Sequence, residues 1–291
     1  EIDSTQNLRF RANGNYSHSL SETSGTSRAF NGNQVRQNEG ERQNRTEGTV
    51  KSLSANALYR KRFAKAGRTI STRLNAGVYD NDRSGQLQAV NTFFENGITG
   101  RSDTLQQYNQ QRNQRYNFGL NTAYTEPLGR QKFLLADYSF SQNSNDSKQE
   151  VFDVLEGAKR MLNQQLSNHY RGIYRYHRAG LAFRWTPQKL NFSAGLAMQH
   201  TELDGRLLAQ MVDIEQSFWN VLPNLRMVYD LGSSQDISLD YETFVQEPSL
   251  QQLQPLVDNS DPLNIYVGNP DLQPEYTHDL GLRYFLYDQF S

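Results

Sequence analysis

The sequence predicts an all-β fold, an antiparallel up-and-down transmembrane β-barrel, and three observations lead to it. Apolar and polar residues alternate over stretches of about ten positions, and such stretches recur along the chain. The segments between them are short turns and long polar stretches in alternation. The mean hydropathy is low, at −0.80, although aromatic residues make up 11% of the chain. A disordered chain would be poor in aromatic residues, and a soluble α/β enzyme would carry longer aliphatic runs.

The alternation predicts about ten strands, each with one apolar face. In the clearest stretch, Leu190, Phe192, Ala194, Leu196 and Met198 alternate with polar or small residues. Similar or weaker alternation predicts the other strands, over residues 8–18, 53–59, 70–78, 116–124, 134–140, 179–185, 219–229, 237–245 and 276–286.

The connections predict which end of the barrel is which. Short turns with Gly or Pro are expected at residues 65–68, 126–131, 186–189 and 231–236. Long polar loops are expected over residues 19–49, 80–113, 143–173, 202–216 and 247–273. Short periplasmic turns and long extracellular loops are typical of outer-membrane barrels. Tyrosines and tryptophans near the strand ends are expected to form aromatic girdles at the membrane interfaces: Tyr79, Trp185, Trp219, Tyr229 and Tyr287.

Two features of the sequence allow a different interpretation of the fold. Alternating strands with long loops also describe a soluble β-sandwich or an adhesion domain, although the regular sorting of long and short loops favours the barrel. Within the third long loop, apolar residues between Val151 and Leu166 recur at helical spacing, and they predict a short amphipathic helix.

Composition excludes several kinds of function. The 30 Lys and Arg residues balance 31 Asp and Glu residues, so a nucleic acid is not expected as a partner. Cysteine is absent, which excludes disulfides, thiolate metal sites and cysteine nucleophiles. The five histidines are scattered, and the sequence carries no HExxH, P-loop or GxSxG motif. We therefore expect no catalytic residue, no cofactor and no metal site.

An enzyme remains an alternative hypothesis. Ten-stranded outer-membrane proteases activate water with Asp and His residues at the extracellular rim, and this chain has a similar length and strand number. Rim residues of those types are present, although their spacing does not single them out: Asp82, His200, Asp204, Asp258 and Asp261.

The last third of the chain carries a more specific signal. The segment Gly268-Asn269-Pro270-Asp271-Leu272-Gln273-Pro274-Glu275-Tyr276 resembles the GNPxLxPE motif of TonB-dependent receptor barrels. Segments 178–181, 222–225, 246–255 and 261–264 are similar to the same family. The chain thus resembles the large TonB-dependent outer-membrane barrels common in Bacteroidota, mainly over residues 166–291.

The motif residues are expected to be structural. Pro270 and Pro274 bias the residues before them away from helix, and Glu275 would begin a descending strand. Seven residues would then fix the entry from loop to strand without contacting a ligand: Gly268, Asn269, Pro270, Asp271, Leu272, Pro274 and Glu275.

The resemblance implies a function in import. Such receptors capture a scarce nutrient (a siderophore, glycan, cobalamin or peptide) on their extracellular loops. A plug domain blocks the lumen until the TonB complex pulls on it. The family's barrels have about 22 strands. Residues 1–291 would accordingly be a partial outer-membrane β-barrel domain in contact with lipid, whose plug and remaining strands lie outside this chain.

Overall fold

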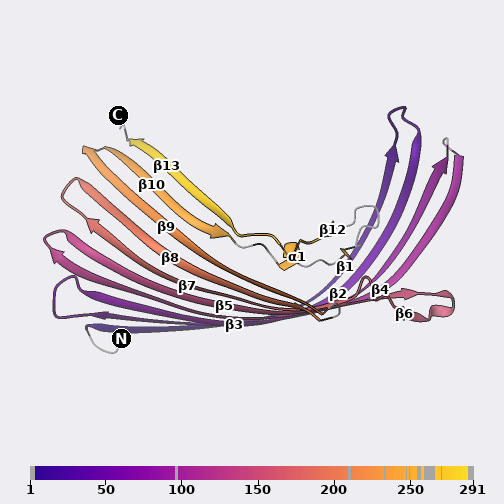
Figure 1. Cartoon of the computed structure of the whole chain (residues 1–291), viewed down its shortest axis with the longest axis horizontal. Helices are drawn as coiled ribbons and strands as arrows, with labels where there is room; N and C mark the ends of the chain where they lie inside the picture. The colour runs from indigo at the N-terminus through magenta and orange to yellow at the C-terminus, as the bar shows by residue number, and fades with distance from the viewer. Residues whose placement is uncertain are drawn as a thin grey trace.

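A single antiparallel sheet, bent into a trough, contains most of the chain in the computed structural model (Figure 1). The structure describes residues 4–95, 98–208, 211–232, 234–246, 248, 250–253, 257–258, 266–269 and 271–287. Ten strands follow one another in the order β1-β2-β3-β4-β5-β7-β8-β9-β10-β13, which confirms the predicted all-β fold and strand number. They are β1 (Gln6–Phe30), β2 (Arg36–Arg62), β3 (Thr69–Glu95), β4 (Ile98–Gly129), β5 (Lys132–Val154), β7 (Asn168–Trp185), β8 (Leu190–Leu207), β9 (Val212–Gly232), β10 (Gln235–Gln246) and β13 (Glu275–Leu286).

The remaining elements are short. Strand β6 (Arg160–Leu162) pairs with the end of β5, and a 3₁₀ turn, η1 (Glu156–Ala158), precedes it. Helix α1 (Leu250–Leu253) and the small ladder of β11 (Val257–Asp258) with β12 (Tyr266–Val267) belong to the connection between β10 and β13. Helix α1 lies on the open, concave side of the trough (Figure 1).

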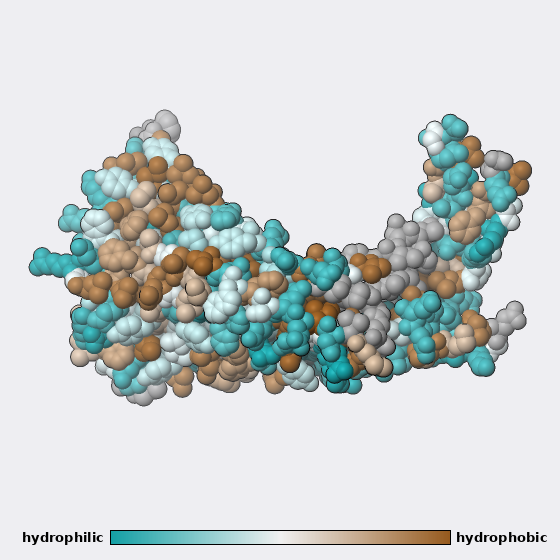
Figure 2. Space-filling model, viewed as in Figure 1, coloured by the Kyte–Doolittle hydropathy of each residue, from teal (hydrophilic) through white to brown (hydrophobic). Residues whose placement is uncertain are grey.

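The two faces of the sheet differ in polarity. Register pairing places Leu181 of β7 opposite Leu196 of β8, and Leu196 opposite Pro223 of β9, so apolar side chains line up across strands. We call this face the outer face. Its apolar band is formed by residues that the structure leaves exposed, among them Phe10, Leu53, Leu74, Val78, Phe118, Leu181, Leu196, Val221, Leu280 and Leu282. Figure 2 shows apolar side chains gathered over β10 and β13, as expected for a surface that meets lipid.

The inner face carries the intervening polar residues. Asn75 lies opposite Gly119, Gly77 opposite Asn117, and Gly195 opposite Asn224. Because successive side chains of a strand point to opposite faces, this polar row is the necessary counterpart of the apolar band.

The aromatic residues follow the same rule. Trp185, Trp219 and Tyr229 are exposed on the outer face, as the predicted girdles require. The prediction for Tyr79 is wrong. Val78 points outward, so alternation turns Tyr79 to the inner face, where the guanidinium of Arg115 lies over its ring.

The prediction of long loops is largely wrong, because most of these segments belong to strands. Strands β1 to β5 contain 25, 27, 27, 32 and 23 residues, whereas about 9–11 residues cross a bilayer. Pairing continues to the hairpin tips, with Phe30 opposite Arg36 and Glu95 opposite Ile98. Most of the described residues in segments 19–49, 80–113, 143–173 and 202–216 are therefore paired strand. In segment 247–273 the described residues form α1 and the short β11–β12 ladder and are otherwise irregular.

The physical reason is that apolar and polar residues alternate only where the two faces of a strand have different surroundings. A strand whose two faces have the same surroundings shows no alternation. Beyond the bilayer both faces of a strand meet water, so both are polar and the period of two disappears while the backbone pairing continues. At the tip of the first hairpin the side-chain carbonyl of Asn31 accepts hydrogen bonds from the backbone N–H groups of Asn33 (3.0 Å) and Val35 (2.9 Å). This local bonding closes the turn.

The helix predicted between Val151 and Leu166 is also wrong. Strand β5 continues to Val154, and Val151 is fully buried opposite Asn109 of β4. Gly157 has a φ of 79°, which a helix does not accept, and the chain then returns as β6. None of the helical turns in the described part of the chain has the length or apolar character that a membrane-spanning helix requires.

The assignment of the two faces predicts the effect of a buried charge. Leu196→Arg places a cation in the apolar band and should cost about 2–4 kcal/mol of barrel stability. Ser193→Arg, on the inner face of the same strand, should be tolerated, because it points to the polar side. Barrel assembly is measured by the heat-dependent shift of the full-length protein on gels, and equal tolerance of both variants would contradict the assignment.

The orientation is testable because this segment contains no cysteine. Asn33→Cys, at the tip of the β1–β2 hairpin, should react on intact cells with a maleimide that does not cross the outer membrane. Ala66→Cys, in the short turn between β2 and β3, should react only after the membrane is opened. Labelling of Ala66→Cys but not Asn33→Cys on intact cells would reverse the orientation.

Candidate functional site

The inner face carries a cavity of about 670 Å³ beside helix α1. We call it the inner-wall cavity. It lies well away from the short turns, in the upper part of the wall, and Leu253 of α1 is 2% exposed beside it. The inward-facing side chains that line it come from six strands and from the β10–β13 connection: Ser52, Ser54, Tyr79, Arg115, Asn117, Asn143, Asn145, Tyr170, Tyr174, Leu203, Pro248 and Leu253.

Tyr170 anchors the floor of this cavity. It is 1% exposed and packs with Leu207 and Ile214. Its hydroxyl lies over two glycines, since a Cβ at Gly172 would come within 2.4 Å of that oxygen and a Cβ at Gly205 within 2.6 Å. Burial raises the pKa of the Tyr170 hydroxyl, so the ring stays neutral. The two glycines are therefore what allows a large ring to lie flat on the wall.

Two polar side chains of the cavity differ in how they are held. The Arg115 guanidinium lies 5.6 Å from the centre of the Tyr79 ring, and its Nε donates a hydrogen bond of 3.3 Å to Oδ1 of Asn113. Both contacts orient the guanidinium. By contrast, Oδ1 and Nδ2 of Asn145 are buried and have no hydrogen-bond partner within the described part of the chain.

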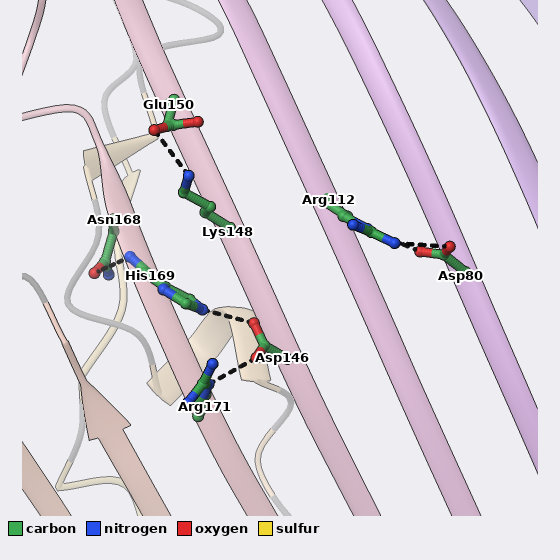
Figure 3. A network of polar contacts seen from close by, with 8 residues as sticks. All are labelled: Asp80, Arg112, Asp146, Lys148, Glu150, Asn168, His169 and Arg171. Atoms are coloured by element: carbon green, nitrogen blue, oxygen red, sulfur yellow. Dashed lines mark hydrogen bonds and ion pairs between the residues drawn. The ribbon is translucent and has the colours of Figure 1, made fainter.

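The outer face above the apolar band is ion-paired (Figure 3). Asp146 of β5 accepts hydrogen bonds of 2.7 Å from both His169 and Arg171 of β7, and Arg112 of β4 pairs with Asp80 of β3 at 3.3 Å. Burial alone raises the pKa of the Asp146 carboxyl, but the bonds from His169 and Arg171 outweigh it and hold that pKa below its ordinary value. This surface is thus charged but compensated.

The residues of the enzyme hypothesis are not brought together. Asp82 lies on β3, whereas His200 and Asp204 lie on β8, with β4, β5 and β7 between them. His200 stacks on Trp219 with 4.4 Å between ring centres. Asp261 lies outside the described residues, and so does the side chain of Asp258. Among the residues that the structure describes, no three His, Asp or Glu side chains are grouped to hold a metal ion.

The motif near the C-terminus forms a turn before the last strand. The backbone N–H of Asn269 donates to the carbonyl of Gln252, at 2.6 Å, and its side-chain Oδ1 accepts from the N–H of Asp271 at 3.0 Å. Glu275 is the first residue of β13. Gly268 is buried, and Leu272 and Pro274 are half-buried, while Pro270 lies outside the described residues.

Sequence reasoning missed the residues of the inner-wall cavity. It placed Tyr170 and Asn145 in a polar loop and Tyr79 at the membrane interface. Continuing the period of two upward from each predicted strand would have turned Tyr79, Arg115, and Asn145 inward together. No sequence pattern predicts that helix α1 lies beside the cavity, because the residues of an irregular connection follow no fixed period.

The packing of Tyr170 gives a stability prediction. Gly172→Ala should push the buried Tyr170 ring and lower barrel stability by about 1–3 kcal/mol. Gly14→Ala is a matched control, because the nearest atom to its added Cβ is 3.9 Å away. The temperature of the gel shift of the full-length barrel measures both. Gly172→Ala with the same transition temperature as the parent would contradict the tight packing.

Comparison with known proteins places this geometry in a family. The sequence model described as the outer membrane protein beta-barrel family matches residues 61–291. No curated protein matches the chain in sequence.

Several solved structures resemble the fold. The copper transporter OprC is 13% identical, with a TM-score of 0.47 over 96% of this chain and 46% of that chain. FpvA of P. aeruginosa, solved with bound pyoverdines, is 9% identical, with a TM-score of 0.42 over 97% and 46%. The ferric citrate transporter FecA is 11% identical, with a TM-score of 0.38 over 80% and 44%. The chain spans less than half of each of these proteins.

The family match covers most of the chain, and it agrees with the outward apolar band and the polar inner wall. The protein therefore belongs to the outer membrane protein beta-barrel family and is located in the outer membrane, where its bent sheet forms part of a barrel wall.

Proposed function

We propose that this chain forms part of the barrel of a TonB-dependent receptor, which imports a scarce nutrient across the outer membrane. The observation that carries the proposal is the Gly268–Glu275 motif, placed directly before a strand of an outer-membrane barrel sheet. In that role its seven residues are structural, because Asn269 bonds to the backbone of Gln252 and Asp271, and Glu275 begins β13.

The open edges of the sheet support a larger parent barrel. Within the described residues, β1 pairs only with β2, and β13 only with β10. Unpaired backbone groups at a strand edge are not tolerated in lipid, so further strands must complete the wall. In our proposal these strands, about 22 in all, enclose a plug domain on which the TonB complex pulls.

The inner face supports a transport role over the two alternatives. Its amide-rich wall and the inner-wall cavity offer a polar path and a ligand contact. The outward apolar band fits lipid and does not fit a soluble adhesion domain. The rim residues of the enzyme hypothesis are separated, with Asp82 on β3 and His200 and Asp204 on β8, and we infer that the chain is not an enzyme.

Growth of the producing bacterium tests the import proposal. Deletion of the gene should abolish growth on one class of limiting iron source, cobalamin, peptide or glycan, and deletion of TonB should give the same defect. The intact gene should restore growth, while the gene carrying Leu196→Arg should restore little. Growth equal to the parent strain on every limiting nutrient would contradict import.

A further inference from the structure

The inner-wall cavity has a lining chemistry that selects a ligand. Among the described residues, the inward side chains that line it are tyrosines, serines, asparagines, a single arginine, two leucines and a proline, with no Asp, Glu, His or Met. Carboxamides both donate and accept hydrogen bonds, as ligand hydroxyl groups require. Tyrosine rings offer an apolar surface with a polar edge, which suits the two kinds of surface on a sugar ring. A bare metal ion would find no carboxylate or imidazole here.

Arg115 gives the cavity its charge. No ion pair of Arg115 is present within the described residues, and no described acidic side chain lines the cavity beside it. Its contacts with Tyr79 and Asn113 fix the plane of the guanidinium, whose N–H groups then form a fork. Such a fork binds a carboxylate through two parallel hydrogen bonds.

The side-chain amide of Asn145 lacks hydrogen-bond partners within the described residues, which independently indicates that a ligand binds here. Both polar atoms of its side-chain amide are buried without a hydrogen bond, next to Gly172 on the neighbouring strand. Burying an amide without partners is unfavourable, so a ligand hydroxyl reached by rotation of this side chain would relieve the cost.

The inner face between the cavity and the short turns is also positively charged. The inward-facing residues of β1 to β4 below the cavity include no Asp or Glu. Five exposed arginines lie on that wall and form no ion pair within the described residues: Arg9, Arg11, Arg60, Arg62 and Arg73. Three of them, Arg9, Arg60 and Arg62, border a second hollow of about 500 Å³. A wall of one sign raises the local concentration of anions.

The opposite side of the wall contrasts with it. Asp240 and Glu242 of β10 and Asp279 of β13 face inward, and Asp240 pairs with Arg226 at 3.3 Å. Below the cavity, β1–β4 thus carry inward arginines without an inward Asp or Glu, whereas β10 and β13 also carry acidic residues.

We propose that the inner-wall cavity binds an acidic oligosaccharide, with Arg115 holding the carboxylate of a uronic acid and Asn117, Asn143 and Asn145 holding hydroxyl groups. Tyr79 and Tyr174 contact the sugar faces, and the arginines of β1–β3 attract the anion along the lumen. This inference rests on the proposed import function, whose ligand class it names.

Binding to the purified full-length receptor in detergent tests the inference. The probes are tetramers of galacturonate, mannuronate and guluronate, with maltotetraose as the uncharged control, measured by calorimetry. We expect one uronate tetramer to bind, more weakly as salt increases, and maltotetraose to bind at least about tenfold more weakly. Failure of all three uronates to bind, or equal binding of maltotetraose, would overturn the proposal.

Matched variants locate the site. Arg115→Gln should weaken uronate binding at least about tenfold. Arg112→Gln lies three residues away on the same strand but on the outer face, paired with Asp80, and should leave binding unchanged. Tyr79→Leu should weaken binding of the uronate tetramer while the gel shift of the barrel is preserved. Equal effects of Arg115→Gln and Arg112→Gln would overturn the assignment of Arg115.

The outcomes separate this inference from the import proposal. A receptor whose deletion abolishes growth on an iron chelate, and which binds no uronate, would keep the import function and overturn the inference. Uronate binding that depends on Arg115, without any growth defect on deletion, would support the cavity assignment and contradict import.

Discussion

Every other feature of this structure depends on one constraint: backbone N–H and C=O groups inside a bilayer must bond to one another. Continuous antiparallel pairing meets this requirement along β1–β5, β7–β10 and β13. The pairing fixes the register, and the register turns Leu181 and Leu196 to lipid and the opposite set of residues to the lumen. The same constraint applies to the edges of β1 and β13, which have no further partner among the described strands. Their backbone groups must be paired by other strands in the membrane.

The site follows from the register as well. Tyr170 can lie flat because Gly172 on its own strand and Gly205 on β8 leave space beneath the ring. Arg115 reaches the cavity because it lies opposite Tyr79 across the β3–β4 ladder. Tyr79 and Arg115 lie next to Val78 and Tyr116, at the upper end of the apolar band. The polar wall, its cavity and the row of arginines are therefore consequences of strand length and pairing, and need no separate domain.

The sequence predicts the lower half of the wall well and the upper half poorly. In the bilayer, lipid and lumen impose different polarity on alternate residues, as at Leu190–Met198, so the period of two identifies strands, faces and short turns. Above it, residues such as 19–30 and 101–113 meet water on both sides and read as loops although they are paired. The spacing of Val151 and Leu155 imitates a helix because a strand end and a hairpin follow each other closely. The sequence does not predict the inner-wall cavity for the same reason, because Asn145 and Tyr170 lie in a segment that it predicts as a loop.

We propose that this sheet is a portion of a larger, plugged barrel. The most direct measurement is the size of the native protein in outer-membrane fractions, detected with an antibody against this segment in boiled and unboiled samples. For a larger parent barrel we expect a heat-dependent band several-fold larger than the 33.5 kDa of this chain. A band near 33.5 kDa that shifts on heating would show a complete small barrel instead and would contradict the larger one.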